Sequence, residues 1–108
     1  MKQGGVHLGS YVRAGRLLPR RAAGLRAGVV VLKPDGVMGW HSTLAREELL
    51  IALEGRFDVD IQRSRGGRRT VRLRDGQCLL LPRQTLHRVV NRSRAGARYL
   101  YVTGVLET

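Results

Sequence analysis

The chain contains one cysteine, few aromatic residues and no long apolar run. Cys78 is the sole cysteine among 108 residues, so no disulfide can form within the chain, and a reducing cytoplasm is the expected compartment. No apolar run approaches the roughly 20 residues that a membrane-spanning helix requires. The first residues also lack the apolar stretch of a signal peptide. We therefore expect a cytoplasmic protein that is not embedded in a membrane.

Acidic residues are scarce as well. Asp and Glu number 8 against 20 Lys and Arg, which gives a formal net charge of +12 at pH 7. Such a charge would attract polyanions at low salt. However, the arginines between residues 63 and 74 lack the interleaved aromatic side chains that stack on bases, and they match no nucleic-acid-binding motif. We therefore expect a solvated Arg-rich hairpin and do not favour a nucleic-acid partner.

The length allows one domain with a modest core. Residues 1–26 are rich in Gly and Arg, and no acidic residue precedes Asp35. An Arg-rich start without acids also resembles an organelle transit peptide. We favour instead an N-terminal arm that belongs to the same fold or contacts a partner subunit, and we assign the main domain to residues 27–108.

Short apolar segments alternate with turns from residue 28 onward. Residues 28–33 form a β-branched run, and Pro34-Asp35-Gly36 then has the chemistry of a turn. Residues 37–43 are expected to form a second strand in which His41 and Thr43 share a face. Further strands are predicted at 57–62, 70–73, 78–81, 87–90 and 98–102. This spacing is typical of a small antiparallel sandwich or barrel.

Three residues on the later strands have two interpretations each. Cys78 stands in an apolar run, which favours a small core residue over a catalytic thiol, because buried thiols are inert. Tyr99 and Tyr101 share a face of the last strand. We expect them to pack against the opposite sheet, and a role in lining a ligand pocket is the alternative.

The segment from Thr43 to Leu53 is ambiguous by local propensity. Its Ala, Leu and Glu residues are good helix formers and fit a helical spacing. Because strands are expected on both sides, we predict that it contains a strand instead. Glu48 would then face one side, and the apolar residues Leu49, Ile51 and Leu53 would face the other.

Two groups of residues have a spacing that resembles the two motifs of the cupin family. The first motif runs His-x-His, four residues, Glu, six residues, Gly. In this chain His41, Glu48 and Gly55 fall at those spacings, and Thr43 stands in place of the second His.

The second cupin motif runs Gly, five residues, Pro-x-Gly, two residues, His, three residues, Asn. Gly76, Pro82, His87 and Asn91 match it, while Gln84 replaces the inner Gly. Together, the two motifs match this chain at seven of nine positions.

This resemblance implies an all-β fold, the double-stranded β-helix or jelly-roll cupin barrel. It also implies a divalent metal bound inside the barrel by His41, Glu48 and His87. Two imidazoles and a carboxylate suit Fe, Mn, Ni, Zn or Cu and leave other coordination positions open. Thr43 is expected to be a weak ligand or to hold a metal-bound water, because a hydroxyl is a poor ligand for a divalent metal.

The expected function is binding of a small organic ligand or substrate beside this metal. As an enzyme, the protein would have dioxygenase, isomerase or decarboxylase chemistry, among which the fold does not choose. A non-catalytic cupin that senses or stores a ligand is the alternative, and a basic nucleic-acid-binding module is the third hypothesis. Small cupins usually pair, and the outward apolar residues near 49–53 and 79–81 lead us to expect a homodimer.

Overall fold

The structure, a computed structural model, describes residues 5–63 and 65–105. In those residues the chain forms nine strands and no helix. None of it could therefore cross a membrane as a helix. The strands are β1 (Gly15–Arg16), β2 (Leu25–Leu32), β3 (Val37–Ser42), β4 (Arg46–Glu54), β5 (Arg56–Gln62), β6 (Arg68–Arg74), β7 (Cys78–Leu81), β8 (Leu86–Val90) and β9 (Ala97–Val105). The all-β prediction is confirmed.

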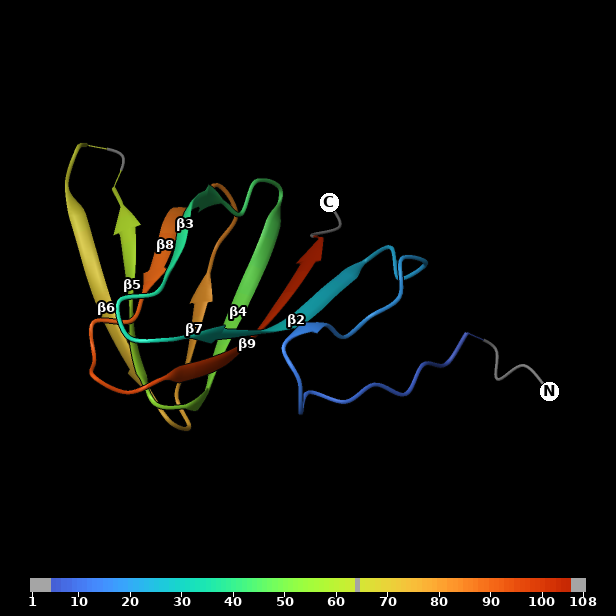
Figure 1. Cartoon of the computed structure of the whole chain (residues 1–108). Coiled ribbons are helices and arrows are strands. Elements are labelled where there is room, and N and C mark those ends of the chain that lie inside the picture. The colour runs from blue at the N-terminus through green and yellow to red at the C-terminus, as the bar shows by residue number, and fades with distance from the viewer. Residues whose placement is uncertain (1–4, 64, 106–108) are drawn as a thin grey trace.

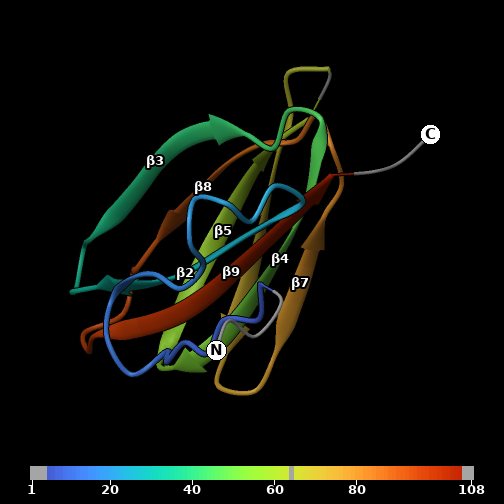
Figure 2. The same cartoon turned by 90° about the vertical axis from the view of Figure 1, so that its right-hand side faces the viewer.

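The strands form two antiparallel sheets that face each other as a jelly-roll barrel. One sheet has the order β1-β2-β9-β4-β7 and the other has the order β3-β8-β5-β6. Figures 1 and 2 show the two layers, with the N-terminal segment lying outside the barrel beyond β2. Within that segment, β1 adds a short edge strand, because Gly15 pairs with Val29 of β2. Where the domain boundary lies stays a prediction.

The ambiguous segment is the strand β4, as predicted. It pairs with β7 on one side and β9 on the other, so every backbone group can find a partner in the ladder. Glu48, Leu50 and Ala52 face inward and are buried, whereas Leu49 and Ile51 on the other face are half-buried. The two-sided pairing outweighs the local helical propensity, which is worth only tenths of a kcal/mol per residue.

The core lies between the two sheets. Tyr99 of β9 packs on Phe57 of β5 with 4.9 Å between ring centroids, which confirms that Tyr99 packs against the opposite sheet. The aromatic pair is joined by aliphatic side chains from both layers: Leu32, Leu50, Ala52, Val59, Leu73, Leu81, Val89 and Ala97. Each large side chain contributes roughly 1.5–3 kcal/mol through its burial.

The outer face of the four-stranded sheet buries two carboxylates under arginines. Asp60 accepts hydrogen bonds from Arg88 and Arg92, and Asp58 accepts them from Arg72 and Arg92. The hydrogen bonds from Arg92 hold the pKa of Asp60 far below its ordinary value of 3.8. Burial alone would raise the pKa of Asp58, but Arg72 and Arg92 outweigh it, so this pKa is lowered too.

Arg68 and Arg72 therefore do more than the solvated hairpin interpretation predicted. Arg72 pairs with Asp58 at 2.9 Å, and Arg68 and Arg88 both stack on the ring of Trp40, at 5.2 Å and 4.9 Å from its centroid. These arginines cover the outer face of the sheet. Arg63 and Arg65 nearby are exposed, as expected.

The prediction that Cys78 is a core residue is wrong. Cys78 is exposed, because β7 is an edge strand and Cys78 pairs with Ile51, which faces outward. Alternation along β7 buries Leu81 and leaves Leu80 58% exposed. The four apolar residues of β7 therefore point alternately to the core and to the outer face of the sheet.

Candidate metal centre

An irregularity in strand β3 aims His41 into the barrel. Met38 pairs with Val89, but the next regular pair is His41 with His87, so β3 holds one residue more than β8 in this interval. Without this extra residue, strict alternation from Met38 would place Trp40 opposite His87. A bulge of this kind redirects the side chains that follow it. Trp40 faces the outer arginines as a result, and the two imidazoles come together.

Both histidines are held in the same way by a carbonyl two residues earlier. Nδ1 of His41 lies 2.7 Å from the carbonyl oxygen of Gly39, and Nδ1 of His87 lies 3.1 Å from that of Thr85. A carbonyl oxygen can only accept, so each Nδ1 must carry the proton and donate it. In the neutral form of each imidazole, Nε2 is then left with a free lone pair, which is the state a metal ligand needs.

The three predicted ligands converge. Ligand atoms of His41, Glu48 and His87 all lie within 4.8 Å of one another, although the residues come from β3, β4 and β8. Nε2 of His87 is 3.3 Å from Oε1 of Glu48, but it is buried and has no partner in hydrogen-bonding geometry. A buried acceptor without a partner is costly, and a cation bound between these atoms would satisfy it. The donor set therefore fits a divalent metal.

Glu48 also sets the charge of this cluster. Burial of the imidazole lowers the pKa of His87, but the neighbouring Glu48 carboxylate and the Thr85 carbonyl outweigh this, so the pKa lies above 6.5. The same carboxylate would stabilise a metal cation at this point. Glu47, one residue earlier, is less buried and alternates with the buried side chains of β4.

Thr43 is buried beside the cluster, where it connects two loops. Its hydroxyl donates to the carbonyl of Pro82 at 2.8 Å and accepts from the backbone NH of Thr85 at 3.0 Å. Thr85 in turn holds the ring of His87 through its carbonyl. Thr43 therefore positions His87 through Thr85. One lone pair of the hydroxyl remains, so its role toward a metal-bound water stays a prediction.

Three further motif positions, those of Gly55, Asn91 and Gln84, concern the conformation and hydrogen bonds of the backbone. A Cβ on Gly55, which has φ +83°, would lie 2.5 Å from the carbonyl oxygen of Gly96. The Asn91 side chain donates to the carbonyls of Leu32 and Ala95. Gln84, where the motif has Gly, has φ 61°, a left-handed conformation that glycine adopts with less strain.

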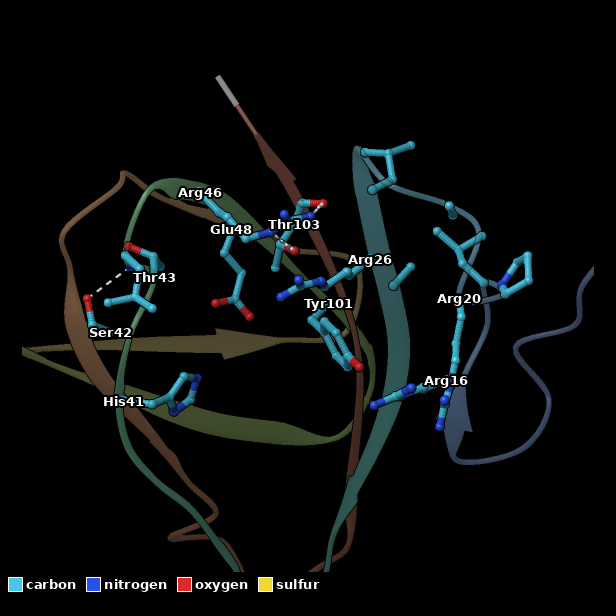
Figure 3. A pocket seen from close by; sticks show the side chains of 16 residues that line it. Arg16, Arg20, Arg26, His41, Ser42, Thr43, Arg46, Glu48, Tyr101 and Thr103 are labelled. Atoms are coloured by element: carbon cyan, nitrogen blue, oxygen red, sulfur yellow. Dashed lines mark hydrogen bonds between the residues drawn. The ribbon is translucent and has the colours of Figure 1, made fainter. Parts of the chain in front are cut away.

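A pocket of about 710 Å³ opens in front of the candidate metal centre. His41 and Glu48 belong to its wall, whereas His87 lies behind them and is fully buried. Tyr101 also lines the pocket, so the alternative interpretation holds for this tyrosine (Figure 3). The ring of Tyr101 lies against Gly28 of β2, where a Cβ on residue 28 would be 2.6 Å from the ring.

Sequence reasoning missed four arginines in the pocket wall. Arg46 is on β4, Arg26 is on β2, and Arg16 and Arg20 come from the N-terminal segment (Figure 3). Their spacing carries no periodic signal, because they meet only through the pairing of β2 with β1 and β9. His7 is exposed, and its Nε2 lies 3.1 Å from the carbonyl oxygen of Leu17.

Several solved structures are similar to this chain. A cupin 2 conserved barrel domain protein from Salinispora arenicola is 28% identical, with a TM-score of 0.68 and coverage of 85% of this chain and 74% of that one. The cupin domain of Schizosaccharomyces pombe Cnp3 is 16% identical, with a TM-score of 0.73 and coverage of 86% and 60%. Oxalate oxidase in complex with the substrate analogue glycolate is 20% identical, with a TM-score of 0.70 and coverage of 76% and 42%.

The chain spans about half of the length of these last two proteins, and their likeness shows a shared fold. A search of curated proteins found no match to this chain. The sequence model of the cupin domain matches residues 28–103, which is well over half of the chain and includes every strand from β3 to β8. With the barrel and the clustered motif residues, this match shows that the chain belongs to the cupin family.

Proposed function

We propose that this protein binds a divalent metal through His41, Glu48 and His87, and that it binds a small organic molecule in the pocket beside it. The observation that carries the proposal is the buried Nε2 of His87, which has no hydrogen-bond partner and faces a carboxylate and a second imidazole. Imidazole and carboxylate ligands suit Fe, Mn, Ni, Zn or Cu, so the donor set does not select the metal.

Each residue has a defined task in this proposal. The carbonyls of Gly39 and Thr85 fix the tautomer of each imidazole, and Thr43 holds the Thr85 loop in place. The metal, when bound, supplies a Lewis acid with open positions for a ligand. Burial of Glu48 and His87 keeps bulk water away from that side of the centre, so a ligand reaches it from the pocket.

Metal binding can be tested by equilibrium dialysis against each of the five metals, with elemental analysis of the protein. The parent should bind one equivalent of at least one metal. Replacement His87→Ala should weaken binding at least about 100-fold, since even the indirect partners of a metal ligand contribute 10–100-fold. His7→Ala is the matched control and should change nothing. Full metal content in the His87→Ala protein, or no binding by the parent, would overturn the proposal.

Catalysis and ligand sensing remain as two candidate functions at the same site. The similar oxalate oxidase, described with a substrate analogue, supports an enzyme. The pocket wall, in contrast, offers no carboxylate or imidazole besides the candidate ligands, which favours binding without acid–base catalysis. Turnover of small organic acids by the metal-loaded protein, measured by product analysis, separates them, because a sensor binds its ligand unchanged. The cytoplasmic location stays a prediction.

We further propose that two copies pair through the outer face of the five-stranded sheet. Leu49 pairs with Val102 and Leu80, and Ile51 pairs with Leu100, so these apolar side chains share one outward face across β9, β4 and β7. The N-terminal segment leaves further apolar side chains in solvent, such as Leu8 at 94% exposure. Leu80 is 58% exposed and the other side chains of this face are half-buried, so a partner that covers the face would bury further apolar surface.

Analytical ultracentrifugation at micromolar concentration tests the pairing. The parent should sediment as a dimer, and Leu80→Arg should shift it to a monomer, because a charge at the centre of a paired apolar face is costly. Val37→Arg is the control, since Val37 is 53% exposed but lies on the other sheet. A monomeric parent would refute this arrangement.

A further inference from the structure

The pocket beside the candidate metal centre carries an excess of positive charge. Four guanidinium groups line it, those of Arg16, Arg20, Arg26 and Arg46, and Glu48 is the single carboxylate among the lining residues. Glu48 belongs to the proposed metal site, where its charge would be balanced by the metal. The rest of the pocket wall is therefore cationic, since arginine stays protonated at any physiological pH.

These arginines have no acidic partners within the described residues, 5–63 and 65–105. The salt bridges found there join arginines to Asp58 and Asp60 on the outer face of the other sheet, and join His87 to Glu48. On that outer face, the two carboxylates compensate most of the charge of the three arginines paired with them. Those in the pocket converge without such compensation, so the charge is available to a ligand.

Arg46 is held in place by neutral groups. Its Nε donates to the hydroxyl of Thr103 at 2.8 Å, and its Nη2 donates to the carbonyls of Thr103 and Gly24. The other guanidinium nitrogen, Nη1, has no such partner in the described chain. A cation fixed by neutral acceptors loses little entropy when an anion binds to it, which makes it a preorganised anion-binding group.

The arginines lie apart from the imidazoles in the pocket. Figure 3 shows His41 on the left, Glu48 and Arg46 above it, and Arg16 and Arg20 on the far side of Tyr101. Arg16 and Arg20 belong to the segment before β2, which thereby completes the wall that β2 and β9 begin. A ligand that spans the pocket would place one end at the metal and the other among the guanidinium groups.

We propose that the ligand is a small organic molecule with two anionic groups, one at the proposed metal centre and the other, a carboxylate or phosphate, among Arg16, Arg20, Arg26 and Arg46. The proposal rests on the proposed metal site for the orientation of the ligand. Guanidinium groups match the planar geometry of these anions and bind them through two parallel hydrogen bonds. A neutral molecule of the same size would leave the pocket charges unpaired.

Titration calorimetry of the metal-loaded protein tests this class with succinate, phosphoglycolate and the neutral succinamide. At least one of the two anions should bind at least about tenfold more tightly than succinamide, and a rise in salt should weaken its binding. Succinate and phosphoglycolate distinguish a carboxylate from a phosphate at the arginine end. Equal affinity for succinamide and both anions would overturn the proposal.

The variants Arg16→Gln and Arg26→Gln identify the residues responsible. Each should weaken the binding of the preferred anion about tenfold, the loss expected for one charged hydrogen-bond pair, while Arg65→Gln in the hairpin should leave it unchanged. Dialysis of the same variants should show unchanged metal content. Unchanged anion binding in both pocket variants, or no preference for the anions in a parent that binds metal fully, would refute the ligand class alone, whereas a parent that binds no metal would refute the proposed function.

Discussion

The buried carboxylate of Asp60 is the most informative single test of how this barrel is stabilised. Asp60 is fully buried on the outer face of the four-stranded sheet. It accepts hydrogen bonds from Thr70 at 2.7 Å, from Arg88 at 2.8 Å and from Arg92 at 2.7 Å. We predict that Asp60→Asn lowers stability strongly, because the amide cannot satisfy all of these donors, leaves Arg88 without its countercharge and leaves Arg92 with Asp58 alone.

The size of the loss follows from these contacts. Breaking a buried ion pair costs about 3–5 kcal/mol. The side chains of Arg88 and Arg92 are 26% and 41% exposed, so water can replace part of what they lose, and about 3 kcal/mol is expected. Unfolding entropy is about 2.1 cal/mol/K per residue, which for 108 residues converts this loss into a fall in Tm of about 13 °C.

The effect of Asp60 should also depend on pH. Its pKa is lowered in the folded state, chiefly by the hydrogen bonds from Arg92. A carboxylate with a lowered folded pKa stabilises the protein above its unfolded value of about 3.8, and this contribution is lost as the pH falls below that value. The stability difference between the parent and the Asp60→Asn protein should therefore be constant near pH 7 and should shrink below about pH 4.

Urea unfolding followed by circular dichroism measures this difference in metal-free protein. Asp75→Asn is the matched control, because Asp75 lies in an exposed turn and its side chain has no ion pair in the described residues. We expect the control to stay within about 0.5 kcal/mol of the parent. Equal stability of the parent and the Asp60→Asn protein at pH 7 would refute this account of the buried cluster.

Four further changes test the backbone and the metal site. Gln84→Gly should raise the free energy of unfolding by about 1 kcal/mol, because glycine adopts this left-handed conformation with less strain. An unchanged free energy of unfolding in urea would contradict this. Gly55→Ala should lower it by about 2 kcal/mol or more, since its Cβ would meet the carbonyl of Gly96, and an unchanged Tm would argue against the packing described. Thr43→Val should weaken metal binding about tenfold in dialysis, because the Thr85 loop loses its anchor; unchanged affinity would remove Thr43 from the site. The double change Arg65→Ser and Arg69→Ser should leave Tm and metal content as they are, and a loss of either would show that the hairpin tip contributes to the fold.

Most of the fold could be predicted from the sequence because strand signals are local. Alternation such as that of Phe57, Val59 and Ile61 gives one buried face, and turns such as Pro34-Asp35-Gly36 end each strand. The observed strands from β2 to β9 coincide with the predicted ones within a few residues, whereas the short strand β1 was not predicted. The prediction for Cys78 on edge strand β7 was wrong. All four residues of this strand are apolar, so no alternation of apolar and polar residues shows which side chains point to the core, and the sequence could not show that Cys78 faces outward.

The three candidate ligands could be named from motif spacing, but their geometry could not. The extra residue in β3 decides that His41, and not Trp40, lies opposite His87. Local periodicity cannot show such a bulge, because it is defined only against the partner strand. The role of Thr43 was also hidden, since its hydroxyl bonds to residues about forty positions later in the chain.

The sequence by itself determined the strand pattern, the turns and the identity of the residues that could ligate a metal. These depend on side-chain type, on alternation and on the conformations that Gly and Pro allow, which are properties of short segments. Only the tertiary structure decided that Asp58 and Asp60 are covered by arginines and that four other arginines converge on a pocket. Contacts of this kind depend on the pairing of strands distant in sequence, such as β2 with β9 and β5 with β8, and no local pattern encodes that pairing.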